Sequence, residues 1–111
     1  MAVTDSFVEF VLEQLDSFGP ITSKRMFGGV GLYAGDLFFA LIAGDVLYLK
    51  GDDATRAARE AAGARPFQPP NRPSGKGKNQ YDSVPVAILE DRDALLVWVK
   101  QAIAIAGAQH G

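Results

Sequence analysis

Residues 24–50, KRMFGGVGLYAGDLFFALIAGDVLYLK, consist of short apolar runs separated by turn-forming residues. The apolar runs are Gly31–Tyr33, Leu37–Ala43 and Val46–Leu49. Turn formers separate them at Ala34–Asp36 and Gly44–Asp45. Aromatic and branched side chains bounded by glycine and aspartate are typical of strands, and connections this short join antiparallel neighbours. The segment therefore predicts an antiparallel meander, in which the continuously apolar Leu37–Ala43 is a central strand or one covered on both faces.

Amphipathic helices are predicted at both ends of the chain. Residues 5–18 carry apolar side chains at steps of three and four, and Gly19-Pro20 should end that helix. Thr4, Asp5 or Ser6 can cap its first turn. Residues 91–106 repeat the pattern, with Gly107 as the expected end. Its buried stripe is expected to be Leu95, Trp98, Val99, Ala102, Ile103 and Ala106.

Two shorter elements are expected between residues 52 and 88. Asp52 or Asp53 should cap a helix over Ala54–Ala62 that ends at Gly63. Three of its side chains are expected to face water, namely Arg56, Arg59 and Glu60. Tyr81–Ile88 suits one more strand, and Pro85 restricts that strand to an edge or an end of the sheet.

The length and composition indicate one domain spanning residues 1–111. We expect an α+β fold, an antiparallel meander sheet of about four or five strands packed by the N- and C-terminal helices. No apolar run approaches the roughly 20 residues needed to cross a bilayer. The first residues lack the pattern of a signal peptide, and the chain has no cysteine. These features favour a cytoplasmic protein.

Catalytic chemistry is poorly represented, so the chain is not expected to be an enzyme. The single histidine, His110, lies in a tail that should fray, and without cysteine the usual nucleophile–base pairs and zinc sites are missing. Gly28-Gly29-Val30-Gly31 precedes a strand rather than a helix, which favours backbone bends over a phosphate-binding loop. The paired aspartates, Asp52/Asp53 and Asp91/Asp93, are explained as helix caps. No cofactor or metal is expected.

Basic residues are concentrated in one segment. From residue 65 to 80 the chain has four basic side chains and no acidic one, within a stretch rich in proline and glycine that is expected to be a mobile loop. These lysines and arginines could bind phosphate or single-stranded nucleic acid, or they could simply be solvated. The formal net charge of −2 weighs against a dedicated nucleic-acid binder. The candidate contacts are Lys24, Arg25, Arg72, Lys76 and Lys78.

The glycine-rich core resembles the N-terminal domain of the TfoX/Sxy family, the regulators of natural competence. The resemblance rests mainly on residues 25–33, with further matching pieces at residues 39–42, 47–50 and 81–85. The structural residues of the motif are Met26, Phe27, Gly28, Gly29, Gly31, Tyr33 and Tyr48. The resemblance implies a non-enzymatic cytoplasmic domain that contributes to transcriptional control through partner proteins.

Three functions follow, in order of preference. The first is a small regulatory or protein-interaction module with an unidentified protein partner. The second is a nucleic-acid or anion binder that uses the basic loop, and the third is an enzyme for a small ligand. A homodimer is also expected as one possibility, because a short meander leaves edge strands and both long helices carry additional apolar side chains. Those additional side chains are Phe10, Leu96 and Ile105.

Overall fold

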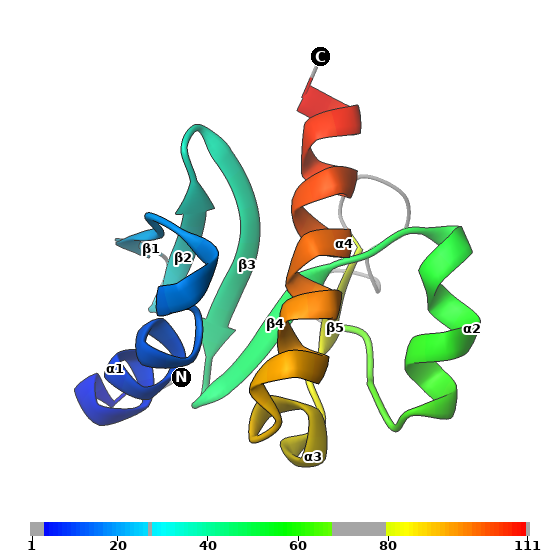
Figure 1. Ribbon diagram of the computed structural model, residues 1–111, viewed down its shortest axis with the longest axis horizontal. Helices are drawn as coiled ribbons and strands as arrows, with labels where there is room; N and C mark the ends of the chain where they lie inside the picture. Colours follow the sequence, from blue (N-terminus) through cyan, green and yellow to red (C-terminus); the bar gives the residue numbers. More distant parts are fainter. Residues whose placement is uncertain (1–3, 27, 68–79, 111) are drawn as a thin grey trace.

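A five-stranded antiparallel sheet, with helices on one face, forms the protein in the computed structural model (Figure 1). The structure describes residues 4–26, 28–67 and 80–110. The strands lie in chain order and are β1 (Thr22–Met26), β2 (Gly29–Ala34), β3 (Leu37–Ala43), β4 (Val46–Lys50) and β5 (Tyr81–Ser83). The helices are α1 (Asp5–Gln14), the 3₁₀ turn η1 (Asp16–Phe18), α2 (Asp53–Ala61), α3 (Val86–Leu89) and α4 (Arg92–His110). The predicted α+β meander, packed by N- and C-terminal helices, is confirmed.

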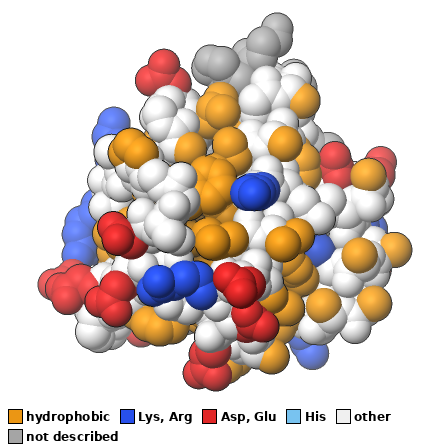
Figure 2. Space-filling model, viewed as in Figure 1, with side chains coloured by type: hydrophobic (Ala, Val, Ile, Leu, Met, Phe, Trp, Pro, Cys, Tyr) orange, Lys and Arg blue, Asp and Glu red, His pale blue; other side chains and the backbone are white. Residues whose placement is uncertain are grey.

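The core lies between the sheet and the two long helices. α1 and α4 both cross the same face of the sheet, and α4 packs on β3 and β4 (Figure 1). Val11 of α1, Leu15 just after it and Val99 of α4 are completely buried there, against Leu32 and Ile42 of the sheet. On the face of the molecule that carries α1 and α4, hydrophobic side chains are partly exposed beside α4, and charged side chains lie around them (Figure 2).

The turn between β3 and β4 positions the N-terminus of α1. Gly44 and Asp45 both have positive φ, 56° each, which suits a tight hairpin between twisted strands. The Asp45 carboxylate accepts hydrogen bonds from the Thr4 backbone N–H at 2.8 Å and from the Thr4 hydroxyl at 3.1 Å. Thr4 is in turn the N-cap of α1, because its Oγ1 accepts from the Phe7 N–H. The hairpin and the first helix are thus joined through one threonine.

Three element boundaries differ from the sequence prediction. The first helix is interrupted at Leu15, beyond which a 3₁₀ turn replaces the expected continuation to residue 18. The strand expected over Tyr81–Ile88 ends at Ser83, since the Pro85 carbonyl accepts from the Ile88 and Leu89 N–H groups and so begins α3. α4 continues through Gly107 to His110, because one glycine inside an alanine-rich helix costs only about 1 kcal/mol.

The glycine inside α4 offers a direct test of that boundary. Gly107→Ala is expected to raise the free energy of unfolding by about 0.5–1 kcal/mol, the usual difference between these residues within a helix. An added Cβ would lie 3.7 Å from Leu37 Cδ1, an ordinary van der Waals contact. Chemical denaturation of both proteins measures the change. A loss of stability would show that the helix ends before Gly107.

Candidate interaction surface

The second face of the sheet, opposite α1 and α4, carries a group of aromatic and apolar side chains that we call the aromatic face. Its members are Met26, Tyr33, Phe38, Leu41, Tyr48, Phe67 and Tyr81. Ring centroids lie 5.2 Å apart for Tyr33 and Phe38, 5.8 Å for Phe38 and Tyr81, and 4.9 Å for Tyr48 and Phe67. These separations are typical of favourable aromatic pairs, so the rings form two groups on this face, one of Tyr33, Phe38 and Tyr81 and one of Tyr48 and Phe67.

A β-bulge in β3 explains why Phe38 belongs to this surface. Leu32 pairs with Ala40, but Tyr33 pairs with Phe38, so β3 contains one extra residue, Phe39, at that point. Strict alternation would place Phe38 on the same face as Ala40, within the core. The bulge lets both Phe39 and Ala40 be buried in the core while Phe38 turns to the opposite face.

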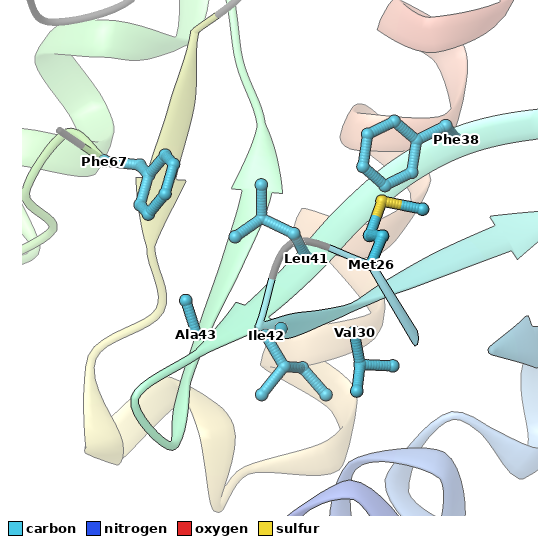
Figure 3. A pocket seen from close by; sticks show the side chains of 8 residues that line it. Met26, Val30, Phe38, Leu41, Ile42, Ala43 and Phe67 are labelled. Atoms are coloured by element: carbon cyan, nitrogen blue, oxygen red, sulfur yellow. The ribbon is translucent and has the colours of Figure 1, made fainter. Parts of the chain in front are cut away.

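A cavity of about 200 Å³ opens on this face. Met26 and Phe38 lie side by side at one end, Phe67 stands at the other, and Leu41 lies between them (Figure 3). The side chains of Val30 and Ile42 point away from this group, into the core. In the described part of the chain the lining consists of Met26, Gly29, Val30, Phe38, Leu41, Ile42, Ala43 and Phe67. Because none of these eight residues has a side chain that can ionise or hydrogen-bond strongly, this lining suits an apolar group rather than acid–base chemistry.

The motif glycines allow β1, β2 and β3 to approach closely beneath this cavity. A Cβ on Gly29 would lie 2.6 Å from the carbonyl oxygen of Ile42 on β3. A Cβ on Gly31 would lie 2.8 Å from Met26 Cε and 2.9 Å from Phe38 Cε1, so the missing side chain makes room for both. Gly28 has φ 77°, a conformation that side chains rarely adopt. The chain continues from these glycines into β2, and no helix follows that could bind phosphate.

The two described basic candidates, Lys24 and Arg25, lie on opposite faces of β1. Lys24 pairs directly with Gly31, so its side chain shares the aromatic face with Met26. Arg25 projects to the helix side, where its Nη2 lies 2.8 Å from the Asp5 carboxylate of α1. The structure therefore does not bring these two residues together into one anion site. Phe27, Arg72, Lys76 and Lys78 lie outside the described residues.

Lys50 and Tyr81 extend the aromatic face to β5. Lys50 Nζ donates a hydrogen bond to the Tyr81 hydroxyl at 3.3 Å and lies 4.9 Å from the centre of the ring. Both residues are only 9% exposed. Burial lowers the pKa of Lys50, whereas burial, together with the charge of a neighbouring Tyr33 phenolate, raises the pKa of Tyr81 to about 12.

The raised pKa of Tyr81 predicts alkaline destabilisation. Between its usual pKa of 10.0 and about 12, the unfolded chain loses the phenol proton while the folded chain keeps it, so this group's contribution to stability falls as pH rises. An absorbance titration of the phenols should show one group that ionises near pH 12, and that group should be missing from Tyr81→Phe. A wild-type titration completed near pH 10 would contradict the burial of this phenol.

A buried ion pair lies beneath β5 and α2, and it corrects one sequence prediction. Arg59 was expected to face water, but its side chain is 2% exposed and its Nη1 lies 3.1 Å from Asp82 Oδ2. Asp82 alternates with Tyr81 and Ser83, so it lies on the helix side of the sheet, where a carboxylate needs a cation. Nη1 also donates to the carbonyl oxygens of Leu49 and Lys50, at 3.1 and 2.9 Å. Burial lowers the pKa of Arg59, and Asp82 opposes that effect.

Neighbouring residues complete the environment of this pair. Gln80 donates to Asp82 Oδ2 at 3.2 Å, and Gly51 leaves the necessary space, since a Cβ there would collide with the Asp82 carboxylate. The guanidinium carbon of Arg59 lies 5.4 Å from the ring centre of Trp98, while Nε and Nη2 have no hydrogen-bond partner among the described residues. Trp98 therefore provides a cation–π contact in place of hydrogen bonds. We interpret the cluster as a structural element that joins α2, β5 and α4.

One aspartate of each predicted capping pair accepts a capping hydrogen bond, namely Asp52 and Asp91, whereas Asp53 lies 3.6 Å from Arg56 Nη2. Asp52 accepts from the Thr55 N–H at 3.0 Å in a capping box, and Asp91 accepts from the Ala94 N–H at 3.2 Å. Within residues 4–26, 28–67 and 80–110, no group of three or more His, Asp or Glu side chains could hold a metal ion. No helix in that part of the chain is both long and apolar enough to cross a membrane.

Comparison with known proteins supplies the family. No individually curated protein matches the sequence significantly. The family model of the TfoX N-terminal domain matches residues 13–106, most of the chain, including all five strands, α2 and most of α4. The resemblance inferred from the glycine-rich motif is thereby confirmed, and this chain belongs to the TfoX N-terminal domain family.

Proposed function

We propose that this chain is a non-enzymatic regulatory domain that binds another protein through the aromatic face. Membership of the TfoX N-terminal domain family supports a regulatory domain of that kind. A role in competence or transcription, and a cytoplasmic location, belong to this proposal and rest on the family resemblance alone.

The observation that carries the proposal is the apolar cavity between Met26 and Phe67. Its walls come from β1, β2 and β3 of the sheet and from Phe67, whose backbone N–H donates to the Tyr81 carbonyl of β5. Aromatic residues and methionine are enriched where proteins bind one another, and an apolar hollow can bury an anchoring side chain of a partner. The cavity therefore suits a protein partner better than it suits a polar substrate.

Leu41 is the residue best suited to a test, because it lies in the middle of the cavity and on the central strand. Leu41→Asn keeps the size and the net charge while replacing an apolar group by a polar one. Val97→Asn is the matched control, since Val97 lies on α4 and is 56% exposed. The tagged full chain and both variants would be expressed in the native cell, and co-purifying proteins quantified by mass spectrometry.

The expected result is that wild type and Val97→Asn retain the same specific partner and Leu41→Asn loses it, by about tenfold or more for a residue at the centre of an interface. Circular dichroism and thermal melting must show that all three proteins are folded. Equal retention by Leu41→Asn would exclude the aromatic face as the binding surface. Loss in both variants would indicate a general effect on the protein and would equally count against the proposal.

A further inference from the structure

β1 is an open edge of the sheet, next to the cavity. Among the described residues it pairs only with β2, whereas β5 at the opposite edge is met by residues 65–67. There the Phe67 N–H donates to the Tyr81 carbonyl and the Ser83 N–H donates to the Arg65 carbonyl, each at 2.8 Å. In an antiparallel pair, alternate residues direct their N–H and C=O groups away from the neighbouring strand. β1 therefore presents unused backbone donors and acceptors to any strand that lies alongside it.

The open edge and the cavity share one residue. Met26 is the last residue of β1 and also lines the cavity. A strand added beside β1 would extend the aromatic face, and every second side chain of that strand would lie on this face. A side chain opposite Met26 could therefore reach the cavity, and one two positions away would lie opposite Lys24.

The charges on β1 indicate which kind of strand can pair with this edge. Lys24 is exposed on the aromatic face, and it has no ion pair among the described residues, whereas Arg25 on the other face is paired with Asp5. A second copy of the protein, joined symmetrically through the middle of β1, would bring the two Lys24 side chains opposite one another, and like charges at that position destabilise a sheet. An acidic side chain there is favourable, so charge complementarity favours a different, acidic strand.

We propose that β1 accepts an extended, acidic segment of a partner protein as a sixth strand. An acidic side chain of that segment faces Lys24, and an apolar side chain two positions away enters the cavity beside Met26. Backbone hydrogen bonds supply affinity in strand addition, while pockets for alternate side chains supply specificity. This inference rests on the proposed function and names the chemistry of the partner.

The test uses a random linear peptide library displayed on phage and selected on the full chain. Wild type should enrich peptides with Asp or Glu two positions from Leu, Ile, Met or Phe. Lys24→Glu should reverse the preference, so that Lys or Arg replaces the acidic residue. Lys24→Gln and Arg25→Gln each remove one positive charge from β1, but on opposite faces. A synthetic peptide of the enriched sequence should bind Lys24→Gln about two- to fivefold more weakly, the range for an exposed cross-strand charge pair, and Arg25→Gln with wild-type affinity.

Hydrogen exchange of the complex with that peptide distinguishes strand addition from other modes. Amides of β1 should gain protection on binding. Two peptides, each methylated at one of the two alternating sets of backbone nitrogens, should differ: the set that hydrogen-bonds to β1 should lose affinity when methylated, and the other set should not. Apolar residues enriched at steps of three or four would mean that a helix binds and would overturn the proposal. Enrichment that is insensitive to Lys24→Glu, or no enrichment at all, would overturn it as well.

Other occupants give different results. Sedimentation that shows a dimer, with the β1 amides protected from hydrogen exchange in that dimer, would assign the edge to a second copy. Salt-sensitive binding of mixed DNA or RNA that requires Lys24 would assign it to nucleic acid. If the native partner is lost with Leu41→Asn but retained with Lys24→Glu, the proposed function stands and strand addition fails. If both variants retain it, the proposed function itself fails.

Discussion

Replacing Asp82 by alanine is expected to lower the free energy of unfolding by about 3–5 kcal/mol. The change leaves the Arg59 guanidinium buried without its carboxylate, and Arg59 is only 2% exposed. Two carbonyl oxygens remain as acceptors for Nη1, but neither carries a compensating charge. Denaturation in urea, followed by circular dichroism, measures the loss.

Asp53→Ala is the matched control for this experiment. The Asp53 carboxylate lies 3.6 Å from Arg56 Nη2, but its side chain is 93% exposed, and exposed pairs contribute about 0–1 kcal/mol. The double variant Arg59→Met/Asp82→Leu removes both charges and should recover much of the stability lost in Asp82→Ala. If Asp82→Ala unfolds at the same urea concentration as Asp53→Ala, water must reach the Arg59–Asp82 pair, and the description of this pair as buried is wrong.

Replacing Gly29 by alanine is expected to cost about 1–3 kcal/mol, the usual range for overpacking a well-packed site. The new Cβ would lie 2.6 Å from the Ile42 carbonyl oxygen. Because that oxygen belongs to the backbone of the central strand, the clash is relieved only if β2 and β3 move apart. The melting temperature should therefore fall.

Gly107→Ala adds the same methyl group at a place where space is available, and the two variants should change stability in opposite directions. Thermal melting of both proteins in one buffer gives the comparison. A Gly29→Ala protein at least as stable as wild type would show that β2 does not approach β3 as closely as described, and that the glycine serves another purpose.

The strands could be predicted because turn formers mark their ends and because antiparallel neighbours follow one another in the chain. Leu37–Ala43 was predicted correctly as a central strand, because it is apolar on both faces. The same pattern does not reveal the bulge at Phe39. A bulge changes which residues share a face without changing composition, so the assignment of Phe38 to the aromatic face required coordinates.

The candidate surface was only partly accessible to sequence reasoning. Lys24, Met26 and the glycines stood out within the motif, but Phe67 is distant in the chain and reaches the cavity because its backbone bonds to β5 at Tyr81. Asp82 gave a signal that could have been used. It occupies the core-facing position of a short strand, and a carboxylate there requires a buried cation, which Arg59 provides.

The central claim is that this domain binds its partner through the aromatic face, and chemical-shift mapping of the labelled protein with that partner tests it most directly. Resonances of Met26, Phe38 and Leu41 are expected to shift or broaden on binding, together with the backbone amides of β1. Trp98, which lies beside Arg59 on the other side of the sheet, should remain unchanged. Shifts confined to Trp98 and the exposed side of α4, with the cavity residues unaffected, would contradict the claim.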